Sequence, residues 1–156
     1  MESASINDVI EDIATKPAVV SLFPVYTIMD EVPVIGVPDA VLFLGSKPRY
    51  VIELKTTGGN VRMLPGESIV QANCYAYALD SMGFDCGQMG LAIVRLKRGA
   101  SSDRNEVLHN VVWGLIEGKT SMVENAIHSR FGLEARIHLL DYRKEKAERD
   151  RKRVGE

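Results

Sequence analysis

Three charged residues in two neighbouring β-rich runs are the residues best placed to do chemistry. Glu53 and Lys55 lie two residues apart in the run Tyr50-Val-Ile-Glu-Leu-Lys, so both side chains should project from one face of a strand. Asp39 lies near the start of the preceding run, where antiparallel pairing would bring its carboxylate beside that of Glu53. Charges in apolar strands are costly to bury unless they are paired or bind a metal. The spacing therefore predicts a site of two carboxylates and one lysine.

Such a site is suited to metal-assisted hydrolysis. Asp39 and Glu53 would hold Mg²⁺ or Mn²⁺ through oxygen, with the backbone carbonyl of Leu54 and water completing the ligand shell. Lys55 would stabilise developing negative charge or orient the attacking water, which the metal makes easier to deprotonate. We therefore expect phosphodiester hydrolysis, although a Glu-Xaa-Lys pair on a solvated strand surface is the alternative.

The same residues resemble the signature of the PD-(D/E)XK nuclease superfamily, in which Pro38-Asp39 is followed by a strand, a turn and then Glu53-Leu54-Lys55. Gln71 and Tyr75, at i and i+4 of the next expected helix, look like the QxxxY element of its RecB-like branch, which includes CRISPR-associated exonucleases. The resemblance covers about residues 34–79. It implies a restriction-endonuclease-like core, with Gln71 and Tyr75 beside the active site, where they help to position the lysine or the substrate. The alternative for this pair is an ordinary, partly exposed helix face.

The chain departs from this branch in two respects. A first-helix histidine often serves as an additional ligand there, but all three histidines of this chain come late. Glu11 is the candidate substitute, with Asp8 and Asp12 behind it, and a solvated helix face explains each acid equally well. The cysteine quartet of an iron-sulfur cluster is missing, because Cys74 and Cys86 are the only cysteines. We expect no such cluster, and packed side chains rather than nucleophiles at these two positions.

Length and charge indicate one small domain. The chain has 156 residues and a formal net charge of -2, which predicts a single nuclease-like domain at residues 1–141 and a charged tail at 142–156. The tail is equally consistent with a solvated helix end and with a phosphate-binding arm. Few cysteines, no membrane-length apolar run and no secretory signal predict an intracellular, cytoplasmic protein.

Hydrophobic periodicity predicts an α/β fold, a mixed sheet flanked by helices with the site at one sheet edge. Trp113 is expected in the core. The expected elements are a helix at 4–15, strands and turns at 18–38, a hairpin of 34–44 and 49–55 joined by a turn at 45–48, a helix at 67–81, strands at 88–96 and 107–116, a helix at 120–131, and a strand at 135–140.

Together these features predict a Mg²⁺- or Mn²⁺-dependent deoxyribonuclease, acting as an exonuclease or on single strands. So small a chain leaves little room for a sequence-reading module, so we expect recognition of DNA backbone, ends or single strands. A homo-oligomer or a protein partner is possible. Two alternatives stay open. One is a nuclease fold that binds nucleic acid or a partner without cutting, and the other is a junction- or flap-specific endonuclease.

Overall fold

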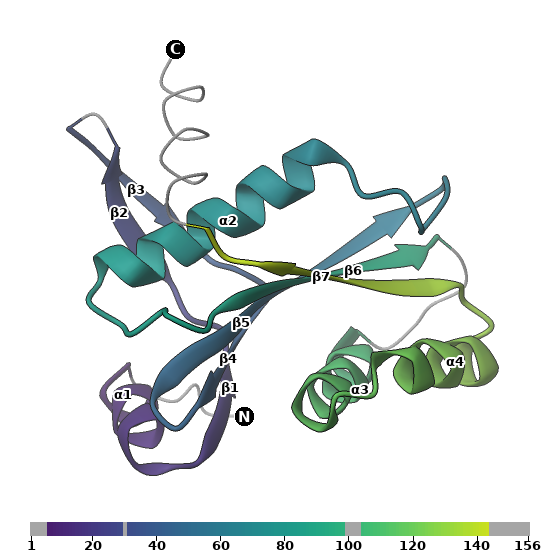
Figure 1. Cartoon of the computed structure of the whole chain (residues 1–156), viewed down its shortest axis with the longest axis horizontal. Helices are drawn as coiled ribbons and strands as arrows, with labels where there is room; N and C mark the ends of the chain where they lie inside the picture. The colour runs from purple at the N-terminus through teal and green to yellow at the C-terminus, as the bar shows by residue number, and fades with distance from the viewer. Residues whose placement is uncertain (1–5, 30, 99–103, 144–156) are drawn as a thin grey trace.

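The computed structural model describes residues 6–29, 31–98 and 104–143, and a five-stranded mixed β-sheet lies at its centre (Figure 1). The strands are β1 (Ala18–Ser21), β4 (Ala40–Leu44), β5 (Lys47–Thr57), β6 (Gly90–Lys97) and β7 (Ala135–Asp141). They lie in the order β1-β4-β5-β6-β7. β5 and β6 run parallel, whereas the other neighbouring pairs are antiparallel. The central strand is therefore β5.

Helices cover both faces of this sheet (Figure 1). The helices are α1 (Ile6–Thr15), α2 (Gly66–Ser81), α3 (Arg104–Glu117) and α4 (Thr120–Phe131). α1 and α2 pack on one face, and α3 and α4 pack on the other. None of the described helices is both long enough and apolar enough to cross a bilayer. The predicted α/β class, with a mixed sheet flanked by helices, is confirmed.

Two features of the chain position the central strand under α2. Gly45 and Ser46 both have positive φ, 58° and 71°, as a two-residue hairpin turn of type I′ requires, so β4 and β5 pair tightly. The parallel β5–β6 pair needs a crossover, which α2 provides. Ala72 and Ala76 of α2 are fully buried, and their small side chains let the helix lie close to the sheet.

The predicted strand at 107–116 is wrong, because this segment belongs to α3. Its valines favour a strand by propensity. However, Val107, Val111 and Leu115 recur every four residues and form a buried helical stripe against the sheet. The predicted core position of Trp113 is also wrong, since 45% of that residue is exposed. Tertiary packing here overrides the intrinsic preference of the residues.

The predicted hairpin is present, but its first strand is shorter than expected. The run at 34–44 divides between β3 (Val32–Gly36), which pairs only with β2 (Val25–Met29), and β4 in the main sheet. Pro38 falls in the break between them, where a residue without an N–H interrupts no ladder. The turn is also shorter, because β5 begins at Lys47.

The other predicted elements are present with small shifts at their ends, namely the first helix, the strands at 18–38, the helix at 67–81, the strand at 88–96, the helix at 120–131 and the last strand. Residues 4–5 of the predicted first helix lie outside the described residues.

The described part of the predicted tail packs on the domain. The backbone N–H of Tyr142 donates to Met89 O at 3.0 Å, and its hydroxyl donates to Asp80 Oδ2 at 3.0 Å. Residues 144–156 of that tail lie outside the described residues. The folded domain therefore extends past residue 141.

Candidate active site

The site lies where β5 extends beyond the end of its antiparallel partner, β4. The β4–β5 pairing ends at Ala40 and Ile52, so Glu53 and Leu54 have no β4 residue opposite them. Asp39, directly before β4, fills this gap. Its Oδ2 accepts a hydrogen bond from Leu54 N at 2.7 Å, and its own N–H donates to Glu53 Oε1 at 3.3 Å. These reciprocal bonds hold the two carboxylates side by side.

The pleat of β5 sets the direction of each side chain. Val51 belongs to the core under α2, whereas Ile52 and Leu54 belong to the core over α3 and α4. Glu53 and Lys55 therefore face α2. In an extended strand the N–H and C=O of one residue point to the same side. Because Leu54 N–H points to Asp39, the Leu54 carbonyl faces the same gap.

The site therefore lies on the central strand rather than on an edge strand of the sheet. The sequence predicted a site at one sheet edge, and β5 lacks an antiparallel partner only beyond the end of its pairing with β4. A hairpin pattern in the sequence does not reveal how many further strands pair beyond it, and β6 and β7 cover the other side of β5.

The environment of Glu53 opposes its ionisation. The residue is 4% exposed, and burial, followed by the nearby charge of Asp39, raises the pKa of its carboxyl from 4.5 to about 7. Lys55 Nζ lies 3.6 Å from Glu53 Oε2 and acts in the opposite direction. The effect of Lys55 is smaller than the effects of burial and of Asp39, so a further positive charge beside Glu53 would favour its ionised form.

A hard divalent cation would supply this positive charge. The two carboxylates and the Leu54 carbonyl are oxygen donors, as Mg²⁺ and Mn²⁺ prefer. Within the described residues no three His, Cys, Asp or Glu side chains cluster in a way that could hold a metal. The protein would thus supply few ligands, leaving positions for water and a substrate oxygen, which is the usual arrangement for Mg²⁺.

A chain of polar contacts leads from Lys55 to α2. Lys55 Nζ donates to Gln71 Oε1 at 2.7 Å, and Gln71 Nε2 donates to Tyr75 Oη at 3.3 Å. Burial, then the charge of Glu53, raises the pKa of the Tyr75 hydroxyl. The Tyr75 ring lies against Gly36, where any side chain would collide with it. The structure thus brings Gln71 and Tyr75 together with the Asp39, Glu53 and Lys55 group.

Comparison with known proteins gives no guide to this site. No family model, curated protein or solved structure matches the chain. The roles of its residues therefore rest on the geometry and on the sequence motifs.

Within the described residues, the acids of the first helix do not cluster with Asp39 and Glu53. Glu11 is exposed on α1, and no described cluster of metal-binding side chains joins it to Asp39 and Glu53. Asp12 forms an ion pair with Lys16 at 3.1 Å. α1 packs its buried Ile13 into the core under α2, whereas Asp8 and Glu11 are exposed. The metal role predicted for Glu11 therefore has no geometric support.

Arg104 is a site residue that sequence reasoning missed. This first residue of α3 places Nη2 at 2.6 Å from Asp39 Oδ1. It follows Asp39 by 65 residues, and no motif marks it. Its guanidinium supplies positive charge to the carboxylate that the metal would otherwise neutralise.

The two cysteines behave as packed side chains. Both are half-buried free thiols. Burial, with Asp80 and Asp85 nearby, raises the pKa of the Cys86 thiol to about 12, which disfavours the nucleophilic thiolate.

Proposed function

We propose that this protein is a Mg²⁺- or Mn²⁺-dependent deoxyribonuclease with a restriction-endonuclease-like core. The observation that carries the proposal is the reciprocal pairing of Asp39 and Glu53 across the Leu54 backbone, with Lys55 beside them on the same face. Two adjoining carboxylates and a cation in this order match the chemistry of phosphodiester hydrolysis.

Each residue has a defined role in that reaction. Asp39, Glu53 and the Leu54 carbonyl would hold the ion, which supplies Lewis acidity and a more acidic bound water. Lys55 carries the positive charge that stabilises charge building on the phosphate oxygens.

Two residues of α2 act on Lys55 rather than on the phosphate. Gln71 orients the ammonium group through its side-chain oxygen, and Tyr75 fixes the amide of Gln71. The lysine is thereby preorganised before substrate arrives.

The substrate proposed is DNA that presents single strands or ends. The site lies on the central strand of a small domain whose helices pack on the sheet. Contacts to the backbone, which carry no sequence information, are then the main source of affinity.

Cleavage assays on purified protein test this proposal. Labelled single- and double-stranded DNA would be incubated with Mn²⁺, Mg²⁺ or EDTA, using wild type, Glu53→Gln and Lys55→Ala. Glu117→Gln is the matched control, because Glu117 is exposed on α3. Metal-dependent cutting that both site variants lose and the control keeps supports the proposal. Equal cutting in all four proteins refutes it.

One observation favours a second candidate, a nuclease fold that binds nucleic acid without cutting. Arg104 occupies an oxygen of Asp39, and no described third acid joins the pair. Folded protein that binds DNA equally well in EDTA and in Mn²⁺, and never cuts, would establish this candidate.

A junction- or flap-specific endonuclease would use the same catalytic residues. A panel of flapped, branched and linear DNA separates it from a nuclease of ends and single strands. Preference for the branched substrates by at least tenfold in kcat/KM would favour it.

A further inference from the structure

Arg95 is a buried cation on the same face of the sheet as the candidate site. Only 8% of this residue is exposed. Its β6 neighbours Leu91 and Ile93 belong to the core under α2, whereas Val94 belongs to the opposite core. The alternation of the strand therefore places Arg95 on the face that carries Glu53 and Lys55.

Strand register places a cation on each side of Arg95. Lys55 of β5 is its parallel partner, and Arg136 of β7 is its antiparallel partner. Adjacent strands lie about 4.8 Å apart. Lys55 faces Glu53 at 3.6 Å, and Arg136 Nε lies 3.7 Å from a carboxylate oxygen of Glu124. Arg95 has no such counter-charge among the described residues, and its Nε is buried without a hydrogen-bond partner.

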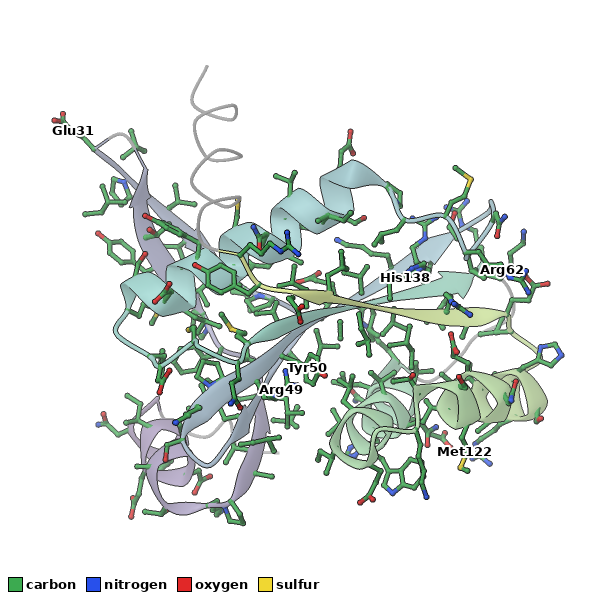
Figure 2. The ribbon with its side chains drawn as sticks, in the orientation of Figure 1. Glu31, Arg49, Tyr50, Arg62, Met122 and His138 are labelled. Carbon is green, nitrogen blue, oxygen red and sulfur yellow. The ribbon has the colours of Figure 1, made fainter. Side chains whose placement is uncertain are left out.

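Lys97, the next basic residue of β6, is already engaged in hydrogen bonds within the protein. Lys97 Nζ donates to the carbonyls of Gly58 and Gly59, at 3.1 and 2.9 Å. His138 Nε2 lies 2.9 Å from Val61 O. These contacts fasten the loop that follows β5 to β6 and β7. Figure 2 shows His138 away from the start of β5, towards the end at which this loop lies. Lys97 is thus committed to backbone carbonyls, whereas no described carboxylate pairs with Arg95.

A guanidinium whose buried Nε lacks a partner, and which has no counter-charge among the described residues, is unfavourable for the free protein, so its presence requires a reason. We propose that Arg95 anchors a second phosphate subsite, one strand away from Lys55. Guanidinium binds phosphate through a planar fork of donors, and its fixed positive charge favours an anion over a metal ion. A backbone phosphate next to the scissile one is the ligand, so the nucleic-acid strand crosses from β5 towards β7.

This inference rests on the proposed function for the identity of the polyanion. The experiment compares wild type with Arg95→Met, which keeps an unbranched apolar side chain at the position. The control is Arg130→Met on α4, which packs on the opposite face. Affinity for a labelled single-stranded oligonucleotide is measured by anisotropy in Ca²⁺ at several salt concentrations. Tm is measured with and without inorganic phosphate.

Arg95→Met should weaken oligonucleotide binding by roughly three- to tenfold and make the slope of log K against log salt shallower by about 0.7, as expected for one lost phosphate contact on a single strand. Its Tm should be unchanged or higher, because a buried charge has been removed. Arg130→Met should leave affinity and slope unchanged.

Unchanged affinity and slope in Arg95→Met overturn the inference, and so does a large loss of Tm, which would show a structural role. A different contrary result is that inorganic phosphate raises Tm in wild type but not in Arg95→Met, while oligonucleotide affinity is the same in both. That result would overturn nucleic acid as the ligand of Arg95 and identify a small anion in its place. Arg95-dependent binding by a protein that never cuts keeps this inference and refutes the nuclease. Cutting by a protein in which Arg95→Met changes nothing keeps the nuclease and refutes this inference.

Discussion

Replacing Glu53 by glutamine should stabilise the metal-free protein at alkaline pH but not at acidic pH. Glutamine has the shape of a protonated glutamate and keeps an oxygen for the N–H of Asp39, which Glu53 Oε1 now accepts at 3.3 Å. The variant therefore imitates the neutral form of the site at every pH. The ion pair of Glu53 with Lys55 at 3.6 Å, which the variant lacks, opposes this gain without outweighing it, because the pKa of Glu53 is raised despite Lys55.

The sign follows from the direction of the pKa change. Because the folded-state pKa of Glu53 is raised from 4.5 to about 7, the folded protein binds more protons than the unfolded chain between these values. The stability from this group is complete below about pH 4.5 and is lost as the pH rises through about 7. At about 1.4 kcal/mol per pH unit, the upper limit of the loss is about 3 kcal/mol.

The coupling to Asp39 reduces this limit, so about 1–3 kcal/mol is expected. The assay is urea unfolding in EDTA at about pH 5 and about pH 9, with Glu117→Gln as the exposed control. Glu53→Gln should match wild type at the acidic pH and exceed its stability at the alkaline pH. A variant less stable than wild type by the same amount at both values would refute the reasoning.

Three further substitutions test other contacts. Arg104→Ala should tighten Mn²⁺ binding by up to about fivefold in calorimetry, since it frees Asp39 from a partly exposed ion pair worth at most about 1 kcal/mol; unchanged affinity would remove Arg104 from the site. Gly36→Ala should push the ring of Tyr75 aside and cost about 1–3 kcal/mol in urea unfolding together with a lower kcat, and wild-type values for both would contradict the packing. Ile127→Ala, in the core over α3 and α4, should cost about 2–5 kcal/mol in the same unfolding assay with the metal affinity unchanged; a loss of metal affinity in folded protein would show that the two faces are coupled.

The sequence was informative where function depends on local pattern. The spacing of Glu53 and Lys55 indicates a common face, and the turn residues Gly45 to Pro48 indicate a hairpin, so the approach of Asp39 could be predicted. Helical spacing likewise places Gln71 and Tyr75 on one face. Each of these inferences spans a few residues or one turn, which is the range in which period and turn chemistry act.

The remainder depends on packing between distant segments. The valine content of α3 suggests a strand until its four-residue stripe meets the sheet, and the contact of Arg104 with Asp39 arises only when α3 docks. Arg95 lies within an otherwise apolar run of the sequence, and only the strand register shows that Lys55 and Arg136 are its cross-strand neighbours. Such contacts carry no local signature.

The central claim is that Asp39 and Glu53 bind the divalent ion that cleavage requires. The most direct measurement is a Mn²⁺ titration by electron paramagnetic resonance, run beside cleavage of labelled single-stranded DNA at the same Mn²⁺ concentrations. The account predicts that wild type binds Mn²⁺ and cuts over the same concentration range, and that Glu53→Gln loses both. Cutting that persists in Glu53→Gln, or a wild-type protein that binds no Mn²⁺, would contradict it.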